Sequence, residues 1–130
     1  MPISRIDLAH GRSTEFRKTI GDIVYTAMVE IAKVPKDDWF QIITEHPLTE
    51  IVYPENGYLD IKYSNNIIFI QITWLQGRTV EVKKTFYKRI ADDLHAQLKV
   101  RKEDVWINLI DVKREDWSFG NGEMQYEPKP

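Results

Sequence analysis

Hydrophobic residues recur at intervals of three and four positions in two segments of the chain. In the first segment they are Phe16, Ile20, Ile23, Val24, Ala27, Met28 and Ile31. In the second they are Val82, Phe86, Ile90, Leu94 and Leu98. This spacing places the apolar side chains on one face of a helix, so the pattern predicts two amphipathic helices. For the first helix, Ser13 or Thr14 is a candidate N-cap and Pro35 a stop.

Four shorter apolar runs predict strands. The run from Ile67 to Trp74 is almost continuously apolar, which is typical of a central strand covered on at least one face. A second buried strand is expected from Ile3 to Leu8. The two remaining runs, 39–45 and 105–111, each follow a predicted helix.

Most of these segments occur twice at a constant offset. Gly11-Arg12-Ser13 and Gly77-Arg78-Thr79 lie 66 positions apart (77 − 11), and the same offset places 39–45 on 105–111 and 3–8 on 69–74. The chain therefore contains a duplicated β-α-β unit. We predict an α/β (α+β) fold in which the units share a four-stranded mixed sheet with both helices on one face. The first strand would run parallel to the second and antiparallel to the third.

The repeat also predicts the domain organisation. We expect residues 1–130 to form a single domain, with one unit at about 2–45, a linker at about 46–66, the second unit at about 67–112 and a tail at 113–130. Within the linker, Ile51–Tyr53 and Tyr58–Tyr63 are expected to form a hairpin across Asn56-Gly57. The tail carries aromatic residues and is expected to fold back on the body.

Composition narrows the classes of function. With 42% apolar and 29% charged residues, the 130-residue chain is typical of a soluble globular protein. The absence of cysteine excludes disulfides, thiolate zinc sites and cysteine nucleophiles. A net charge of −2 with interspersed signs predicts no nucleic-acid binding. No apolar run has the length of a membrane span and no signal peptide is recognised, so no membrane association and a cytoplasmic location are expected. His10, His46 and His95 lack metal-ligand spacing, so no metal and no cofactor are predicted.

The strongest candidate for chemistry is Pro2, which follows the initiator methionine. Methionine before proline is normally removed, and the mature chain would then begin with a secondary amine. The predicted sheet places Pro2 near Asp38, at the start of the second strand, and near Gln76 and Arg78, after the third. Asp38 would favour the ammonium form and Arg78 the neutral amine, so the sequence leaves open whether Pro2 acts as a base or an acid.

Several motifs together resemble one family. They are Pro2, Val34-Pro35-x-x-Asp38, Gly77-Arg78, Phe86-Tyr87-Lys88 and Asp116-Trp117-Ser118-Phe119-Gly120-x-Gly122. This set resembles the tautomerase superfamily, in particular the branch around malonate semialdehyde decarboxylase. The resemblance implies a homotrimer whose active sites use the N-terminal proline, an aspartate matching Asp38 and two arginines. The second arginine matches Arg78, whereas the first falls on Gln76.

The resemblance implies an isomerase that tautomerises a small carboxylate-bearing keto or enol acid. Arg78 would bind the substrate carboxylate, Gln76 would donate a neutral hydrogen bond, and Trp117 and Phe119 would wall the pocket. Decarboxylation of malonate semialdehyde, or hydration, is the alternative reaction. A non-catalytic trimer that serves binding or regulation is the alternative of another class, and it would follow if Met1 were retained.

Each candidate residue also has a structural interpretation. Arg78 can be a surface arginine in a strand-helix turn, as expected for Arg12 at the equivalent position of the first unit. Asp38 can be a strand-entry carboxylate, as expected for Asp104 in the second unit. Asp37 lies beside Asp38, so the sequence does not decide which of the two carboxylates faces the amine.

Overall fold

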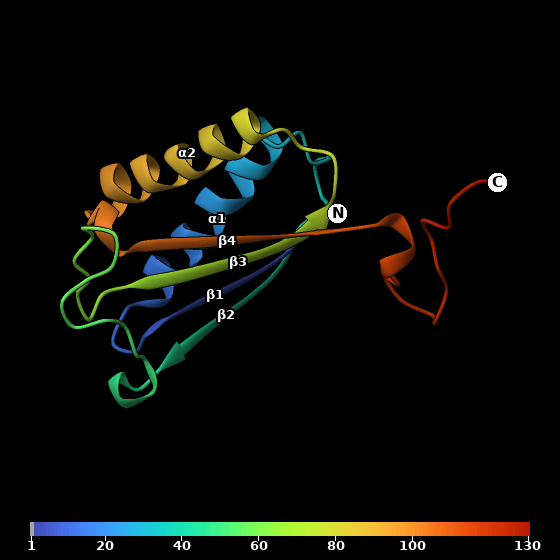
Figure 1. The fold of residues 1–130 in the computed structure, drawn as a ribbon. Coiled ribbons are helices and arrows are strands. Elements are labelled where there is room, and N and C mark those ends of the chain that lie inside the picture. Colours follow the sequence, from blue (N-terminus) through green and yellow to red (C-terminus); the bar gives the residue numbers. More distant parts are fainter. Residues whose placement is uncertain (1) are drawn as a thin grey trace.

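One sheet with both helices on the same face forms the body of the protein (Figure 1). A computed structural model describes residues 2–130. The strands are β1 (Ile3–Ala9), β2 (Phe40–His46), β3 (Ile68–Leu75) and β4 (Val105–Val112), and the helices are α1 (Thr14–Glu30) and α2 (Val80–Leu98). Three short 3-10 turns complete the described elements: η1 (Leu48–Glu50), η2 (Lys102–Asp104) and η3 (Arg114–Asp116).

The strand pairing confirms the predicted duplication. The order is β2-β1-β3-β4, with β1 parallel to β2, β3 parallel to β4, and β1 antiparallel to β3. Ile3 pairs with Phe40, and Phe69 pairs with Trp106, so both parallel pairs have the same register at the offset of 66. A right-handed crossover helix in each unit then places α1 and α2 on the same side of the sheet.

Both helices begin at the side-chain caps that their sequences provide. The Ser13 hydroxyl accepts a hydrogen bond from the Phe16 N–H, and the Thr79 hydroxyl accepts one from Val82. The apolar stripes of the helices pack against β1 and β3. The resulting core includes Ile6, Ile20, Val24, Ile70, Ile72, Trp74, Phe86, Ile90 and Leu94, all fully buried.

The opposite face of the sheet is not covered by a helix (Figure 1). Because strand residues alternate between faces, this side carries apolar residues as well as polar ones. Phe40, Ile42, Trp106 and Ile110 on this face are exposed in the single chain. These four residues lie on the two edge strands, with Arg5 and Gln71 between them, and exposed apolar side chains of this kind are typical of a surface that binds another chain.

The predicted linker hairpin is wrong. In the segment that follows η1, residues 51–67, the described structure contains an isolated bridge between Tyr58 and Ile61 and no strand. The chain reverses at Leu59 and Asp60, which both have positive φ, rather than at Asn56-Gly57, and the pairing ends after the Tyr58–Ile61 bridge. The linker is instead held by Asp104, whose buried carboxylate accepts hydrogen bonds from the N–H (2.8 Å) and the hydroxyl (2.6 Å) of Ser64.

The C-terminal tail extends beyond the end of the sheet where the N-terminus lies (Figure 1). It turns back mainly on itself: Trp117 stacks on Phe119 at 5.3 Å between ring centroids, and the Gln125 side chain bonds the backbone of Phe119 and Gly120. The tail meets the body where the ring of Phe119 faces that of Phe40 at 6.3 Å.

Candidate active site

A narrow hollow surrounds Pro2 at the start of β1. Its wall consists of Pro2, Ser4, Tyr25, Met28, Asp38, Trp39, Phe40 and Gln41. We call it the prolyl hollow. Pro2 directly precedes β1 and Ser4 lies in it, Tyr25 and Met28 belong to α1, and the others belong to the start of β2 and the two residues before it. Pro2 and Ser4 are both buried, so the prolyl ring lies inside the protein surface.

The parallel register explains why a distant aspartate reaches Pro2. Ile3 pairs with Phe40, so the residues just before them, Pro2 and the Asp38-Trp39 segment, lie at the same end of neighbouring strands. Of the two adjacent aspartates, Asp38 lines the prolyl hollow. Asp37 is exposed and sits in the turn with φ of 76°. The structure thus brings the predicted amine and Asp38 together.

Two aromatic rings close one side of the hollow. Tyr25 and Trp39 stack with their centroids 4.2 Å apart and their planes at 13°. The Tyr25 hydroxyl also accepts a hydrogen bond from the Asp37 N–H at 3.2 Å, which holds the turn that precedes β2. A stacked pair fixed in this way limits the access of water to Pro2 from the side of α1.

Arg78 lies at the same end of the sheet, beyond β3. Its Nε donates to the Ala32 carbonyl (3.1 Å), and a terminal nitrogen donates to the Leu75 carbonyl (2.8 Å). The guanidinium lies 4.3 Å above the ring of Trp74. Burial lowers the pKa of Arg78 from its ordinary value, and the nearby Asp111 opposes this effect. Arg78 is therefore held rigidly, with N–H groups left for a further acceptor.

The residues equivalent to Arg78 and Asp38 in the other unit have different surroundings. Arg12 is exposed, and its guanidinium lies over the ring of Phe16 at 4.5 Å. Asp104 is fully buried and binds the linker, whereas Asp38 is only partly buried and lines the prolyl hollow. Arg12 therefore has different surroundings from Arg78, and Asp104 has different surroundings from Asp38. The candidate site therefore takes Pro2 and Asp38 from the first unit and Arg78 from the second, and the equivalent positions do not form a second such site.

Arg78 does not line the prolyl hollow, and three other predicted residues also lie outside it. Gln76 is exposed, and its N–H donates to the Val112 carbonyl at the end of β4. Trp117 and Phe119 do not line the hollow, although Phe119 faces Phe40, which does. The roles assigned to all three remain predictions.

The sequence interpretation missed Ser4, Tyr25 and Gln41. All three are polar and line the prolyl hollow. Their equivalents in the second unit, at the offset of 66, are Ile70, Ala91 and Ile107, which are apolar. A comparison of the two units, position by position, could have identified these three residues, because the first unit has polar side chains where the second has apolar ones.

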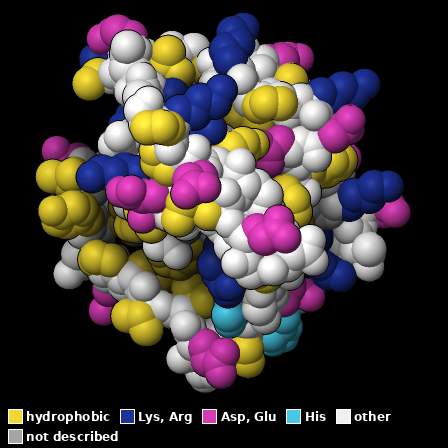
Figure 2. Space-filling view, turned by 90° about the vertical axis from the view of Figure 1, so that its right-hand side faces the viewer, with side chains coloured by type: hydrophobic (Ala, Val, Ile, Leu, Met, Phe, Trp, Pro, Cys, Tyr) yellow, Lys and Arg dark blue, Asp and Glu magenta, His cyan; other side chains and the backbone are white. Residues whose placement is uncertain are grey.

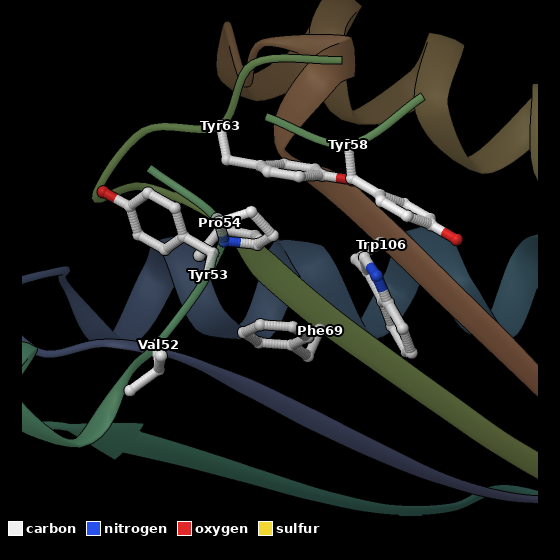
Figure 3. A pocket seen from close by; sticks show the side chains of 8 residues that line it. Val52, Tyr53, Pro54, Tyr58, Tyr63, Phe69 and Trp106 are labelled. Carbon is white, nitrogen blue, oxygen red and sulfur yellow. The ribbon is translucent and has the colours of Figure 1, made fainter. Parts of the chain in front are cut away.

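A second hollow lies on the uncovered sheet face, near the start of β3. Figure 3 shows Tyr53, Pro54, Tyr58 and Tyr63 of the linker facing Phe69 and Trp106 of the sheet. Val52 and Ile67 complete the wall of this aromatic hollow, which encloses about 370 Å³. An adjoining hollow extends from it toward a cluster formed by Asp7, His46 and Glu50.

The His46 cluster provides a pH-dependent link between β1, β2 and η1. His46 Nε2 lies 2.6 Å from an Asp7 carboxylate oxygen, and Nδ1 lies 3.6 Å from Glu50. These carboxylates, Asp7 first, raise the pKa of His46 above 6.5. Because the folded pKa is raised, the stabilisation is complete below the unfolded pKa of about 6.5 and is lost as pH rises through the folded value.

We expect Asp7→Asn to lower the pKa of His46, because it removes the closer carboxylate. A histidine NMR titration of the native and variant chains measures this effect. Glu50→Gln serves as the matched control and should produce a smaller decrease, since Glu50 is farther from the imidazole and 62% exposed. An unchanged His46 pKa in Asp7→Asn would contradict the assignment.

Three further properties of the described residues are their charge distribution, their possible metal-binding groups and the hydrophobicity of their helices. In Figure 2, which views the end of the sheet bearing the tail, acidic and basic side chains are interspersed rather than gathered by sign. Among residues 2–130, no group of three His, Asp or Glu side chains is placed to hold a metal ion. Across the same residues, neither helix combines the length and apolar character needed to span a membrane.

Known proteins are similar to this chain in sequence and in fold. Two family models, each described as "Tautomerase enzyme", match residues 38–120 and 2–55. The chain is 41% identical to "Probable tautomerase YusQ" of Bacillus subtilis (strain 168), over 96% of this chain and 98% of that one. It is 31% identical to "Probable tautomerase YrdN" of the same organism, over 97% and 96%.

Solved structures give the same result. The FG41 malonate semialdehyde decarboxylase inhibited by 3-bromopropiolate is 37% identical, with a TM-score of 0.87 over 95% of this chain and 93% of that one. A fused 4-OT described as a symmetric trimer is 19% identical, with a TM-score of 0.77 over 93% and 94%, and supports the fold alone. The chain belongs to the tautomerase superfamily, in its malonate semialdehyde decarboxylase-like branch.

Proposed function

We propose that this enzyme uses the amine of Pro2, freed by removal of Met1, to tautomerise a small keto or enol carboxylic acid. The observation that carries the proposal is the burial of Pro2 in one hollow with Asp38. In ketonisation, the neutral amine takes the proton of the enol hydroxyl, and the ammonium then delivers a proton to the adjacent carbon. One proton leaves oxygen and one arrives at carbon, so the step needs no cofactor.

Arg78 is proposed to bind the substrate carboxylate. Two of its nitrogens already donate to main-chain carbonyls, which fixes the guanidinium plane and lowers the entropy lost on binding. It directly precedes Thr79, the N-cap of α2, where helix N–H groups add positive potential. Gln76, two residues earlier, is proposed to add a neutral hydrogen bond.

The tail is proposed to exclude water from the bound acid. Trp117 and Phe119 stack on each other, and Phe119 reaches Phe40 at the rim of the prolyl hollow. Removing water strengthens the interaction of a carboxylate with Arg78, since the local dielectric constant falls.

Decarboxylation of malonate semialdehyde, or hydration, is the second candidate reaction. It is favoured by the 37% identity to a malonate semialdehyde decarboxylase. Gln76 occupies the position expected for a further arginine, and a neutral side chain there binds a carboxylate more weakly. Gln76→Arg should therefore raise decarboxylation relative to ketonisation; a fall in the ratio would count against this interpretation.

The chain is also proposed to form a homotrimer through the uncovered face of the sheet. The support is the set of exposed apolar side chains on that face, and the trimeric state is the one that the family resemblance implies. The mass of one chain is 15.4 kDa. Light scattering coupled to size exclusion should give three times this mass, and a monomer at micromolar concentration would contradict the proposal.

The proposed activity is tested on protein whose N-terminus has been established by intact mass. The processed chain is assayed for ketonisation of phenylenolpyruvate and for decarboxylation of malonate semialdehyde. A chain extended so that a residue still acylates Pro2 is the control, because its nitrogen is an amide. Equal turnover by both proteins would contradict the role of the amine, and no turnover by either would favour the non-catalytic alternative, in which the assembly serves binding or regulation.

A further inference from the structure

Asp111, near the end of β4, is connected to Arg78 through a single side chain. One oxygen of its carboxylate accepts a hydrogen bond from the indole N–H of Trp74 at 2.7 Å, and the other lies 2.9 Å from Nζ of Lys83 on α2. Trp74 is fully buried and packs on Phe86 with 5.1 Å between the ring centroids. The guanidinium of Arg78 lies over the same indole ring, 4.3 Å from its centroid.

The first unit repeats the ion pair, which is therefore a feature of the fold. Glu45 and Arg17 occupy the positions equivalent to Asp111 and Lys83, and their side chains approach to 2.9 Å. In each unit a carboxylate near the end of an edge strand binds a cation in the first turn of a helix. We expect the loss of either pair to lower stability to a similar extent, so the pair alone indicates no role in the site.

The second carboxylate oxygen distinguishes the two units. In the first unit it accepts a hydrogen bond from the backbone N–H of Arg12 at 3.2 Å, and the neighbour of Glu45 on β1 is Leu8. In the second unit the neighbour of Asp111 on β3 is Trp74, whose indole N–H is the donor. The fold does not require an indole at this position, because leucine serves in the first unit. The tryptophan stands in the unit whose turn arginine lies over the ring.

Charge also links Asp111 to Arg78. Burial disfavours the guanidinium cation, and the negative charge of Asp111 acts in the opposite direction. The hydrogen bond from Lys83, followed by that from Trp74, lowers the pKa of Asp111 from its ordinary value, which favours the ionised carboxylate. Asp111 uses its oxygens on Trp74 and Lys83, so it supports the cation through the ring and leaves N–H groups of Arg78 for another acceptor.

We propose that Asp111 is a positioning residue: it fixes the ring of Trp74 and thereby the plane in which Arg78 presents its guanidinium to the substrate carboxylate. The inference rests on the proposed function, because it deepens the role assigned to Arg78. An aromatic face attracts a cation placed over it. Rotation of the indole would break a hydrogen bond to a carboxylate, which is stronger than one between neutral groups. The guanidinium is therefore held in position before the substrate binds.

The test compares Asp111→Leu with Glu45→Leu, each of which removes one of the two equivalent ion pairs. Both should lower Tm by a similar, small amount. For Asp111→Leu alone we expect KM for an enol acid to rise about five- to tenfold, with kcat within about twofold of its native value. Asp111→Asn retains an oxygen that can accept from the indole, and it should bring KM back to within about twofold of native.

Hydrogen exchange of two side-chain groups makes the test independent of catalysis. The indole N–H of Trp74 and the Nε–H of Arg78 are both hydrogen bonded and should exchange slowly with solvent in NMR spectra of the native chain. Asp111→Leu should accelerate both exchanges, whereas Glu45→Leu should accelerate neither. Native exchange at Arg78 in Asp111→Leu, an unchanged KM, or an equal rise in KM in both leucine variants would overturn the inference. If Arg78→Ala retains full activity, the proposed function fails, and the exchange rates still decide whether Asp111 holds Arg78.

Discussion

Pro2→Ala is expected to lower kcat/KM for an enol acid about 100-fold in processed protein. General acid-base catalysis by a positioned group contributes about 10²- to 10⁴-fold. The processed alanine variant still begins with a free amine, whose ordinary pKa is about 8, so part of the proton-transfer activity is expected to remain. What it loses is the rigid ring, which holds the nitrogen in the prolyl hollow beside Asp38.

Two control proteins test whether the loss of activity in Pro2→Ala comes from the prolyl amine. Pro47→Ala changes a proline at the opposite end of the sheet, before η1, and should retain native kcat/KM. The chain in which Pro2 remains acylated should lose more than the alanine variant, about 1,000-fold, because no amine is left. If Pro2→Ala and Pro47→Ala behave alike in steady-state kinetics, the amine is not the proton carrier.

Arg78→Ala is expected to lower kcat/KM by about 30- to 1,000-fold, mostly through KM. A fixed guanidinium paired with a carboxylate out of water contributes about 2 to 4 kcal/mol, and 1.36 kcal/mol corresponds to a factor of ten. Arg12→Ala is the matched control, since Arg12 occupies the equivalent turn but is exposed. We expect it to leave both kinetic constants within about twofold of native values.

Stability must be separated from binding for Arg78, because the side chain also bonds Ala32 and Leu75 and lies over Trp74. Arg78→Met retains an aliphatic stem over that ring but removes the charge. Thermal unfolding of both variants measures the structural loss. If Arg78→Met restores KM without restoring charge, or if Arg12→Ala matches Arg78→Ala, Arg78 does not bind the carboxylate.

The fold was largely predictable because each helix and strand is specified by neighbouring residues and because the same pattern occurs twice along the chain. The helical periodicity, the Ser13 and Thr79 caps and the apolar run of β3 each depend on neighbouring residues. The offset of 66 then related distant segments, and the observed registers follow it. The linker was not predictable in the same way. Asn56-Gly57 favoured a hairpin, but Asp104, 40 residues after Ser64, binds that segment instead.

The candidate site was predictable only in part. The sequence by itself determined that Pro2, Asp38 and Arg78 belong to one end of one sheet, since strand order and register follow from the duplicated pattern. Only the tertiary structure decided which carboxylate, Asp37 or Asp38, faces the hollow, because the turn geometry selects between neighbours. It also revealed the connection from Asp111 through Trp74 to Arg78, since burial and hydrogen bonding depend on contacts between β3, β4 and α2 that no local pattern encodes.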